Sequence, residues 1–320
     1  MSRLVASTAA LLAPLVLAGC ATGTAREVSQ RETVPVAEFD VASGAIFDDA
    51  FEPARLRAID PCAALRSAGL ESYGEPASDI PGEPGSCSNF MKDHAGEQFN
   101  VTLYLDNEVY ETPHRIGGLP AEVLPEDDTC FVRAAYQGSG TDALGTKFGM
   151  QVQLLSEGVA DPCSPAVRIL TSVAEIIRTD PPIGSTPGSI ASYDPCSMLT
   201  PVEARDALAG VTSPAEARGL FRCGWSGDNG MSAAVRFDAG RVETGPVPPA
   251  DLGGGTFGSV LPGSIPGGCR VQWVHRGDTT PARDDELAEV SIINSGRLPL
   301  DPCAHAIGAA RAARAKLPRG

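Results

Sequence analysis

The chain has 320 residues, of which 40 are acidic and 25 basic, and its formal net charge is −15. A chain this acidic repels phosphate backbones, so its composition argues against nucleic acid as a partner. The length is enough for more than one domain, and nine cysteines are enough for a disulfide framework.

The N-terminus has the pattern of an export signal with a lipid anchor. Arg3 precedes an uncharged run over 4–16, and Leu17-Ala18-Gly19-Cys20 follows. The run is too short to span a bilayer permanently and has the length of a signal-peptide core. We predict a lipoprotein signal peptide over 1–19, lipid attachment (palmitate-type acyl chains) at Cys20, and anchoring on the extracytoplasmic face of the cell membrane. An ordinary secretory signal cleaved near a cysteine is the alternative.

Residues 20–54 are predicted to form a disordered stalk, because they include few apolar side chains and no hydrophobic period. Ile46, Phe47 and Phe51 are the exceptions. We expect these three side chains to dock on the first domain.

The eight remaining cysteines form two series of four with closely similar intervals. An exported chain meets an oxidising compartment, so an even number of cysteines predicts four disulfides. No two of them are close enough in sequence for the short hook that zinc sites use, and no metal or other cofactor is expected. The first series is Cys62, Cys87, Cys130 and Cys163. The second series is Cys196, Cys223, Cys269 and Cys303.

Each series begins and ends with the tripeptide Asp-Pro-Cys, which occurs at 60–62, 161–163, 194–196 and 301–303. Asp is a good N-cap, and proline suits the first helical position because it has no N–H to lose. Helical periodicity follows over 166–178, and an Ala/Arg-rich counterpart covers 304–317. Thr200 and Glu203 are spaced as a capping box.

Between the helices, apolar and polar residues alternate as in strands. The first copy alternates over 99–105, 130–136 and 148–154, and the second copy matches it. We read each unit as helix, hairpin, hairpin, helix, with a four-stranded antiparallel sheet and the helices on one face. The predicted fold class is α+β, with two tandem homologous domains, each a small antiparallel sheet with flanking helices stapled by two disulfides. The domains cover 55–178 and 194–318, and a linker rich in Pro, Gly and Ser covers 179–193.

The predicted order of strands and helices favours pairing the first cysteine of each series with the second, and the third with the fourth. Cys130 begins a strand whose hairpin partner ends just before Cys163, which leaves Cys62 for Cys87. The same pairing in the second copy joins Cys196 to Cys223 and Cys269 to Cys303. The main alternative pairs the first cysteine of each series with the fourth and the second with the third.

The second copy carries motifs that resemble a known family. Residues 194–204 read D-P-C-S-M-L-T-P-V-E-A, and Cys223-Gly224-Trp225 follows. Together with the lipobox, this pattern resembles actinobacterial lipoproteins of the family called domain of unknown function 3558, here as a tandem pair over nearly all of 55–320. The first copy departs from the pattern, because it lacks the Thr-Pro and has Asn89 where the tryptophan stands. The resemblance implies neither an activity nor a cofactor.

No set of reactive residues repeats between the copies. The sequence contains no nucleophile elbow, zinc-protease motif or phosphate loop. We interpret the histidines as exposed turn or helix-cap residues, and Trp225 and Trp273 as core. The acidic triplets at 126–128 and 284–286 lack the spacing of a calcium loop and are expected to be solvated loop tips. The histidines are His94, His114, His275 and His305.

These observations predict a lipid-anchored cell-envelope lipoprotein that is not an enzyme. It is expected to be a binding or sensor-like module for an envelope protein or a small ligand, in a groove between the domains or between helix and sheet. The alternative is a structural or accessory subunit without a ligand, and a third reading is an enzyme of unrecognised type. A formed apolar cavity with convergent polar groups favours binding, whereas an exposed apolar patch favours the accessory role.

Overall fold

A computed structural model of the protein describes residues 46–138, 147–156, 161–184, 188–263, 267–277 and 284–318. The predicted signal peptide, Cys20 and most of the predicted stalk lie outside these ranges. The part of the chain from Asp40 onward forms one compact unit. Within the described ranges, no helix has both the length and the apolar character that crossing a membrane requires.

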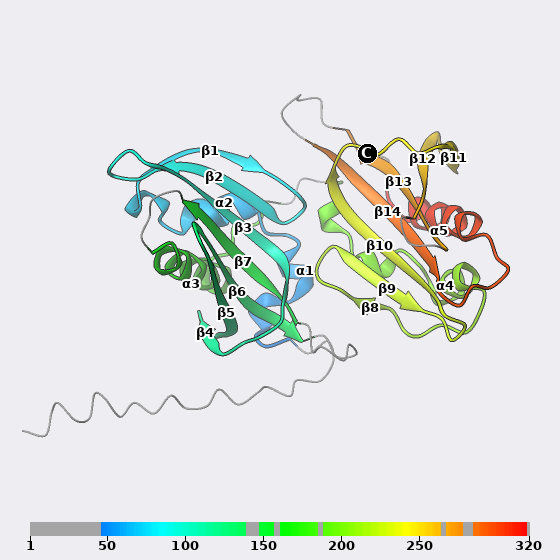
Figure 1. The fold of residues 1–320 in the computed structure, drawn as a ribbon, viewed down its shortest axis with the longest axis horizontal. Coiled ribbons are helices and arrows are strands. Elements are labelled where there is room, and N and C mark those ends of the chain that lie inside the picture. Colours follow the sequence, from blue (N-terminus) through cyan, green and yellow to red (C-terminus); the bar gives the residue numbers. More distant parts are fainter. Residues whose placement is uncertain are drawn as a thin grey trace, which may run out of the picture. The chain divides into compact units, whose positions relative to one another are not determined.

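The first half is built around a seven-stranded antiparallel sheet with the order β1-β2-β3-β7-β6-β5-β4. Short helices precede the sheet and one long helix follows it (Figure 1). In chain order the elements are η1 (Asp49–Phe51), α1 (Pro53–Leu56), α2 (Pro61–Ser67), η2 (Leu70–Ser72), β1 (Glu75–Pro81), β2 (Ser86–Lys92), β3 (Gln98–Val109), β4 (His114–Ile116), β5 (Leu119–Glu126), β6 (Thr129–Gly138), β7 (Lys147–Ser156) and α3 (Cys163–Thr179).

The second half holds another seven-stranded antiparallel sheet with the order β11-β12-β13-β14-β10-β9-β8. Read from the opposite edge, this is the order of the first sheet. Its elements are η3 (Ile190–Ser192), η4 (Pro195–Ser197), α4 (Pro201–Leu208), β8 (Glu216–Ala217), β9 (Arg222–Ser226), β10 (Met231–Gly240), β11 (Val247–Gly253), β12 (Thr256–Pro262), β13 (Gly268–Arg276), β14 (Asp285–Asn294) and α5 (Pro302–Lys316).

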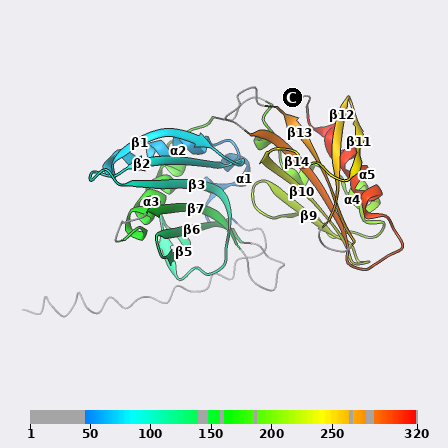
Figure 2. The ribbon, with the colours of Figure 1, turned by 45° about the horizontal axis from the view of Figure 1, so that its top comes forward.

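In each half, helices cover one face of the sheet. Helices α2 and α3 pack on the first sheet, and α4 and α5 pack on the second (Figures 1 and 2). The apolar residues of the predicted alternation lie on the buried face of each sheet. Val101 and Leu103 of β3 and Ile177 of α3 are fully buried. Trp225 and Trp273 are buried in the second half, as predicted. Two-layer packing leaves the other face of each sheet free to carry polar groups.

The Asp-Pro-Cys motifs start helical segments as predicted. The Asp60 carboxylate accepts hydrogen bonds from the Cys62 and Ala63 N–H groups at 2.8 and 3.1 Å. Asp161, Asp194 and Asp301 accept the corresponding bonds from Cys163, Cys196 and Cys303. At the start of α4, Thr200 and Glu203 form the capping box. Side-chain oxygens therefore satisfy N–H groups that a helix start leaves without a backbone partner.

Four disulfides are present, and each joins two cysteines of the same half. The helix that follows Asp60 is tied to β2, and α3 is tied to β6; the second half repeats both ties. The connectivity that topology favoured is the one observed. The pairs are Cys62–Cys87, Cys130–Cys163, Cys196–Cys223 and Cys269–Cys303.

The prediction of four strands per sheet was wrong, because each sheet has seven. The unpredicted strands are β1, β4 and β5 in the first half and β8, β11 and β12 in the second. Several carry prolines, such as Pro76 in β1 and Pro248 in β11, which interrupt the alternation that marks a strand. The strands that carry prolines are at the sheet edges, as β1 and β11 are, or next to an edge strand, as β5 and β12 are.

The last residues of the predicted stalk dock on the first half. Ile46 forms a β-bridge with Gln137, and the Phe47 N–H donates to the Tyr136 carbonyl at 2.9 Å. Phe51 is fully buried. The expected docking is confirmed for the side chains of Phe47 and Phe51, which pack in or against the core, whereas Ile46 is joined to the first half through its backbone.

The linker is also held against the folded part. Its backbone bonds to residues just before α2, since the Asp60 N–H donates to the Pro182 carbonyl at 2.9 Å. The Glu286 carboxylate accepts from the Ser189 hydroxyl and the Ile190 N–H at 2.6 and 2.9 Å. Glu286 therefore lies in β14 with specific partners, and the reading of residues 284–286 as a solvated loop tip was wrong for this residue.

Candidate functional site

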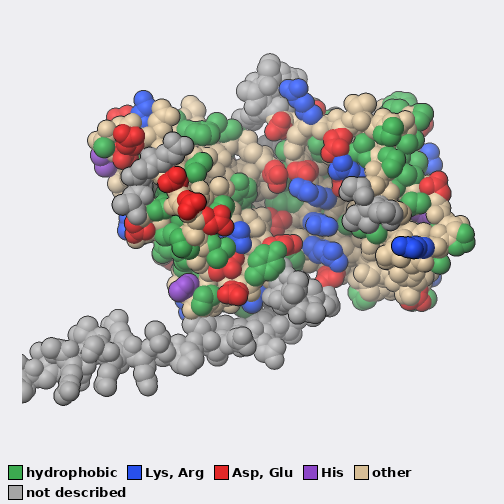
Figure 3. Space-filling view, in the orientation of Figure 1, with side chains coloured by type: hydrophobic (Ala, Val, Ile, Leu, Met, Phe, Trp, Pro, Cys, Tyr) green, Lys and Arg blue, Asp and Glu red, His purple; other side chains and the backbone are tan. Residues whose placement is uncertain are grey.

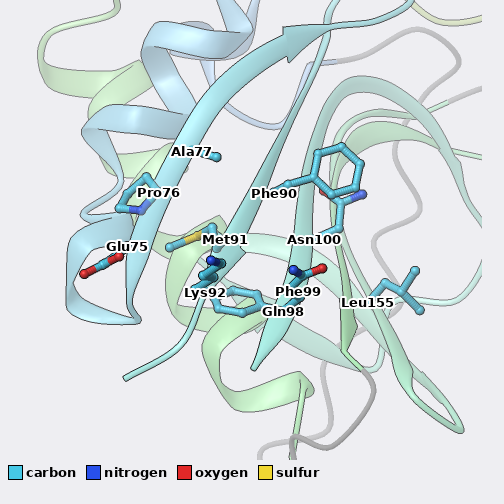
Figure 4. Close-up of a pocket in the computed structure, with 10 residues that line it drawn as sticks. All are labelled: Glu75, Pro76, Ala77, Phe90, Met91, Lys92, Gln98, Phe99, Asn100 and Leu155. Atoms are coloured by element: carbon cyan, nitrogen blue, oxygen red, sulfur yellow. The ribbon is translucent and has the colours of Figure 1, made fainter. Parts of the chain in front are cut away.

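A cavity of about 620 Å³ opens on the first sheet, where β1, β2, β3 and β7 meet (Figure 4). Met91 and Phe99 supply buried apolar surface. Phe90 and Leu155 are 53% and 43% exposed, and both are register neighbours of Asn100, Phe90 on β2 and Leu155 on β7. The cavity is lined by Glu75, Pro76, Ala77, Phe90, Met91, Lys92, Gln98, Phe99, Asn100 and Leu155.

In the part of the chain that the structure describes, the polar side chains around this cavity have no partners. Within the described residues, Glu75, Lys92 and Gln98 form no side-chain hydrogen bond or ion pair. The side-chain oxygen of Asn100, Oδ1, is buried and has no hydrogen-bond partner among the described residues. A buried polar group without a partner destabilises a fold unless something else satisfies it. Apolar surface beside unpaired polar groups is the usual composition of a small-molecule site.

Local backbone features hold the walls of the cavity in place. Asn89 lies on β2, and its amide donates to the Ala77 carbonyl at 2.9 Å while its oxygen accepts from the Ala77 N–H at 3.0 Å. These bonds are made where the backbone pairing of β1 with β2 is irregular, between Pro76 and Asp79. The side chain thus fixes the edge strand that forms one wall.

Two turns close the ends of this region. In the β2–β3 turn, the Asp93 carboxylate accepts from the Ala95 and Glu97 N–H groups at 2.8 Å. Before β1, a Cβ on Gly74 would lie 1.9 Å from the Lys92 carbonyl oxygen. Any side chain at Gly74 would therefore push β1 away from β2.

A second cavity of about 620 Å³ lies beside α2 and the linker, but its charged groups already have partners. Arg66 pairs with Asp79, and Arg57 lies 4.0 Å from Asp194. Asp60 caps α2. The cavity on the first sheet is therefore the better candidate for a ligand, because its polar groups remain free.

The lining of the candidate cavity offers little for catalysis. It contains no serine, cysteine or histidine, and its ionisable side chains are Glu75 and Lys92. Nucleophilic and general acid–base mechanisms place a reactive group within hydrogen-bond reach of an activating partner. The arrangement fits non-covalent binding.

The four histidines do not converge on this cavity. His94 and His114 are exposed, and His305 is half-buried in the first turn of α5. His275 is buried, and its Nε2 lies 2.9 Å from the Gly188 carbonyl oxygen, so the prediction that it is exposed was wrong. It lies on the core face of β13, where the first half has Tyr136.

Sequence reasoning missed a carboxylate that joins the two halves. Asp106, on β3, accepts from the Phe221 N–H at 3.1 Å, and the Tyr136 hydroxyl lies 3.4 Å from it. Desolvation raises the pKa of the Asp106 carboxyl to about 6, although these neighbours favour the charged form. A Cβ on Gly219 would lie 2.1 Å from an Asp106 carboxylate oxygen, so the chain approaches closely only because position 219 is glycine.

The candidate cavity itself left only a weak trace in the sequence. Phe90 and Leu155 break the alternation by placing large apolar side chains on the solvent face of their strands. The sequence shows Asn89 where the second copy has Trp225, but it does not show that Asn89 bonds to β1. Neither signal identifies a ligand by itself.

No family model matches the chain, and no curated protein matches it. Among solved structures, the chain is similar to DynU16, a protein of the dynemicin biosynthetic locus, at 14% sequence identity. The match covers 86% of this chain and 96% of that one, with a TM-score of 0.17. A score this low supports no conclusion about fold or activity.

Proposed function

We propose that this protein is a lipid-anchored lipoprotein of the cell envelope, on the extracytoplasmic face of the membrane, which binds a small amphipathic ligand and catalyses no reaction. The first-sheet cavity is the proposed binding site. The observation that carries the proposal is that, within the described residues, the buried side-chain oxygen of Asn100 has no hydrogen-bond partner and lies in a cavity beside the exposed apolar side chains of Phe90 and Leu155. The ligand would lay an apolar part on Phe90 and Leu155 and a polar part near Asn100.

The proposal includes an origin by duplication, as two homologous copies of one cystine-stapled domain from the lipoprotein family named above. The identical strand order of the two sheets supports it. The register supports it too, because Cys87 pairs with Leu103 on β3 as Cys223 pairs with Val235 on β10. Two copies that keep the same strands and disulfides while their surface residues diverge are suited to binding ligands or partners.

An accessory role without a ligand is the second candidate. Phe90 and Leu155 are exposed and lie on one sheet face, which is the kind of apolar surface that a partner protein covers. In that reading, a neighbouring subunit of an envelope complex occupies the face.

Fluorescence of the neutral hydrophobic dye N-phenylnaphthylamine tests binding to the apolar part of the site in the full mature chain. We expect saturable binding that is lost in Phe90→Ala and in Ala77→Trp, which fills the cavity. Phe257→Ala is the matched control, because Phe257 is a similarly exposed phenylalanine (63%) on the second sheet. No saturable binding, or equal loss in the control, would contradict the ligand site and favour the accessory role.

The anchor is tested separately. Cys20→Ser should abolish palmitate labelling and move the protein from the detergent phase to the aqueous phase in detergent partitioning. A Cys20→Ser protein that still partitions with detergent would contradict lipid attachment at this residue. Affinity capture from native membranes with the anchor intact would then identify an envelope partner.

A further inference from the structure

A smaller cavity, about 250 Å³, lies where residues of the second sheet meet residues of the first. Three of its lining residues are arginines of the second half, namely Arg218, Arg222 and Arg236. Figure 3 shows Lys and Arg side chains gathered in a band on this face of the molecule. The remaining lining residues include Tyr104, Glu83 and Glu108.

The strand register brings the arginines together. Arg222 on β9 lies directly opposite Arg236 on β10. The Arg218 N–H donates to the Arg222 carbonyl at 2.9 Å. A Cβ on Gly224 would lie 3.0 Å from Arg218 Nε, so the Arg218 side chain passes close over a residue without a side chain. Like charges directly opposite in a sheet are destabilising, so a bound anion would stabilise the cluster.

The protein supplies that compensation only in part. Arg236 pairs with Asp238 at 2.9 Å and lies 3.9 Å from Glu83, and Arg218 lies 3.8 Å from Glu216. Within the described ranges, no carboxylate lies at ion-pair distance from Arg222. Partial burial, and then the charges of Arg218 and Arg236, lower the pKa of the Arg222 guanidinium.

The fold does not require these arginines. In the first sheet, Ser86 pairs with Tyr104 at the position where Arg222 pairs with Arg236 in the second sheet. The two positions are equivalent because Ser86 directly precedes Cys87 and Arg222 directly precedes Cys223. A serine and a tyrosine therefore meet the structural needs of these positions. The charges at the second pair call for another explanation.

We propose that Arg218, Arg222 and Arg236 bind the anionic group of a small ligand, a carboxylate or a phosphate. A guanidinium can bind either group through two parallel hydrogen bonds. Glu83, Asp106 and Glu108 line the same cavity, so the rest of the ligand must be uncharged or cationic. This excludes polyanions, and the site is independent of the first-sheet cavity.

The test uses inorganic phosphate and succinate as probes at constant ionic strength. Binding is followed by NMR of the arginine Nε–Hε signals in the full mature chain. We expect saturable shifts of the signals of the three arginines, and a dissociation constant raised about tenfold or more in Arg222→Gln. Arg205→Gln is the control, because Arg205 is exposed on α4 away from the cavity. Tighter binding of phosphate or of succinate identifies the preferred group.

A second variant, Arg222→Ser, introduces the residue of the equivalent first-sheet position and is expected to fold while losing anion binding. Dye binding in the first-sheet cavity should stay unchanged in both Arg222 variants, which separates this site from the proposed function. Non-saturating shifts shared by all arginines, or unchanged affinity in both variants, would overturn the proposal.

Discussion

At the residue scale, Asp106 makes the interaction of the two halves sensitive to pH. Its pKa is raised to about 6 from 3.8 by desolvation, which favours the protonated form in the folded state. The folded protein therefore binds a proton that the unfolded chain releases between these pH values. The stabilising effect of this difference is complete below about pH 4 and is lost as the pH rises through about 6.

Replacing the carboxyl by an amide should remove this dependence. In Asp106→Asn the amide oxygen can still accept from the Phe221 N–H, and no charge has to be desolvated. We expect wild type and variant to have similar free energies of unfolding at about pH 4, and the variant to be more stable by about 1–3 kcal/mol at about pH 7.5. Urea denaturation at both pH values measures the difference.

The matched control is Asp238→Asn. Asp238 lies two residues beyond Arg236 on β10, just as Asp106 lies two residues beyond Tyr104 on β3, but it forms an ion pair with Arg236. Its replacement should not stabilise the protein at the higher pH. If Asp106→Asn is equally destabilising at both pH values, the carboxylate is needed in its charged form and the argument from desolvation is wrong.

Residues in helix starts and disulfides were predictable because their roles depend on local sequence. Asp60 and Thr200 cap helices that begin within three residues, so spacing alone identified them. Asp106, Asn100 and Arg222 derive their properties from segments distant in the chain. Nothing in the sequence near Asp106 indicates that Phe221 is its partner.

At the element scale, the sheet edges were the least predictable part of the fold. In the inner strands β3, β6 and β7, a series of apolar residues at every second position is buried, because one face of the sheet packs against helices. The edge strand β1 is almost wholly exposed, so its sequence carries no such pattern. It is held instead by a side chain, Asn89, from the neighbouring strand.

This dependence predicts the effect of Asn89→Ala. The change removes both bonds to the Ala77 backbone and leaves those groups to water or unpaired, which should cost about 1–3 kcal/mol of stability. Hydrogen exchange should become faster at Ala77 and its neighbours in β1 while exchange in β6 and β7 stays slow. The control is Ser78→Ala, an exposed β1 residue. Uniformly faster exchange across the sheet would show that Asn89 stabilises the whole sheet instead of its edge.

At the scale of the whole molecule, each half has its own helices, sheet and disulfides. Contacts between the halves include Asp106 with Phe221 and Arg236 with Glu83. A Cβ on Gly85 would lie 2.7 Å from the Phe221 ring, so glycine is needed for this approach as well. Each half should therefore unfold as a separate cooperative unit, with modest coupling.

The two tryptophans make this independence measurable. Trp225 and Trp273 both lie in the second half, so their fluorescence follows that half, whereas circular dichroism follows both. Replacing Cys130 and Cys163 by alanine releases a link between residues 33 apart in sequence, which should cost the first half about 3–4 kcal/mol. We expect the dichroism transition of this double variant to split, with its first step at lower denaturant, while the tryptophan transition stays near its wild-type midpoint. The mirror variant at Cys269 and Cys303 should instead move the tryptophan transition. If fluorescence and dichroism shift together by equal amounts in both variants, the halves form one cooperative unit and the division into two domains fails.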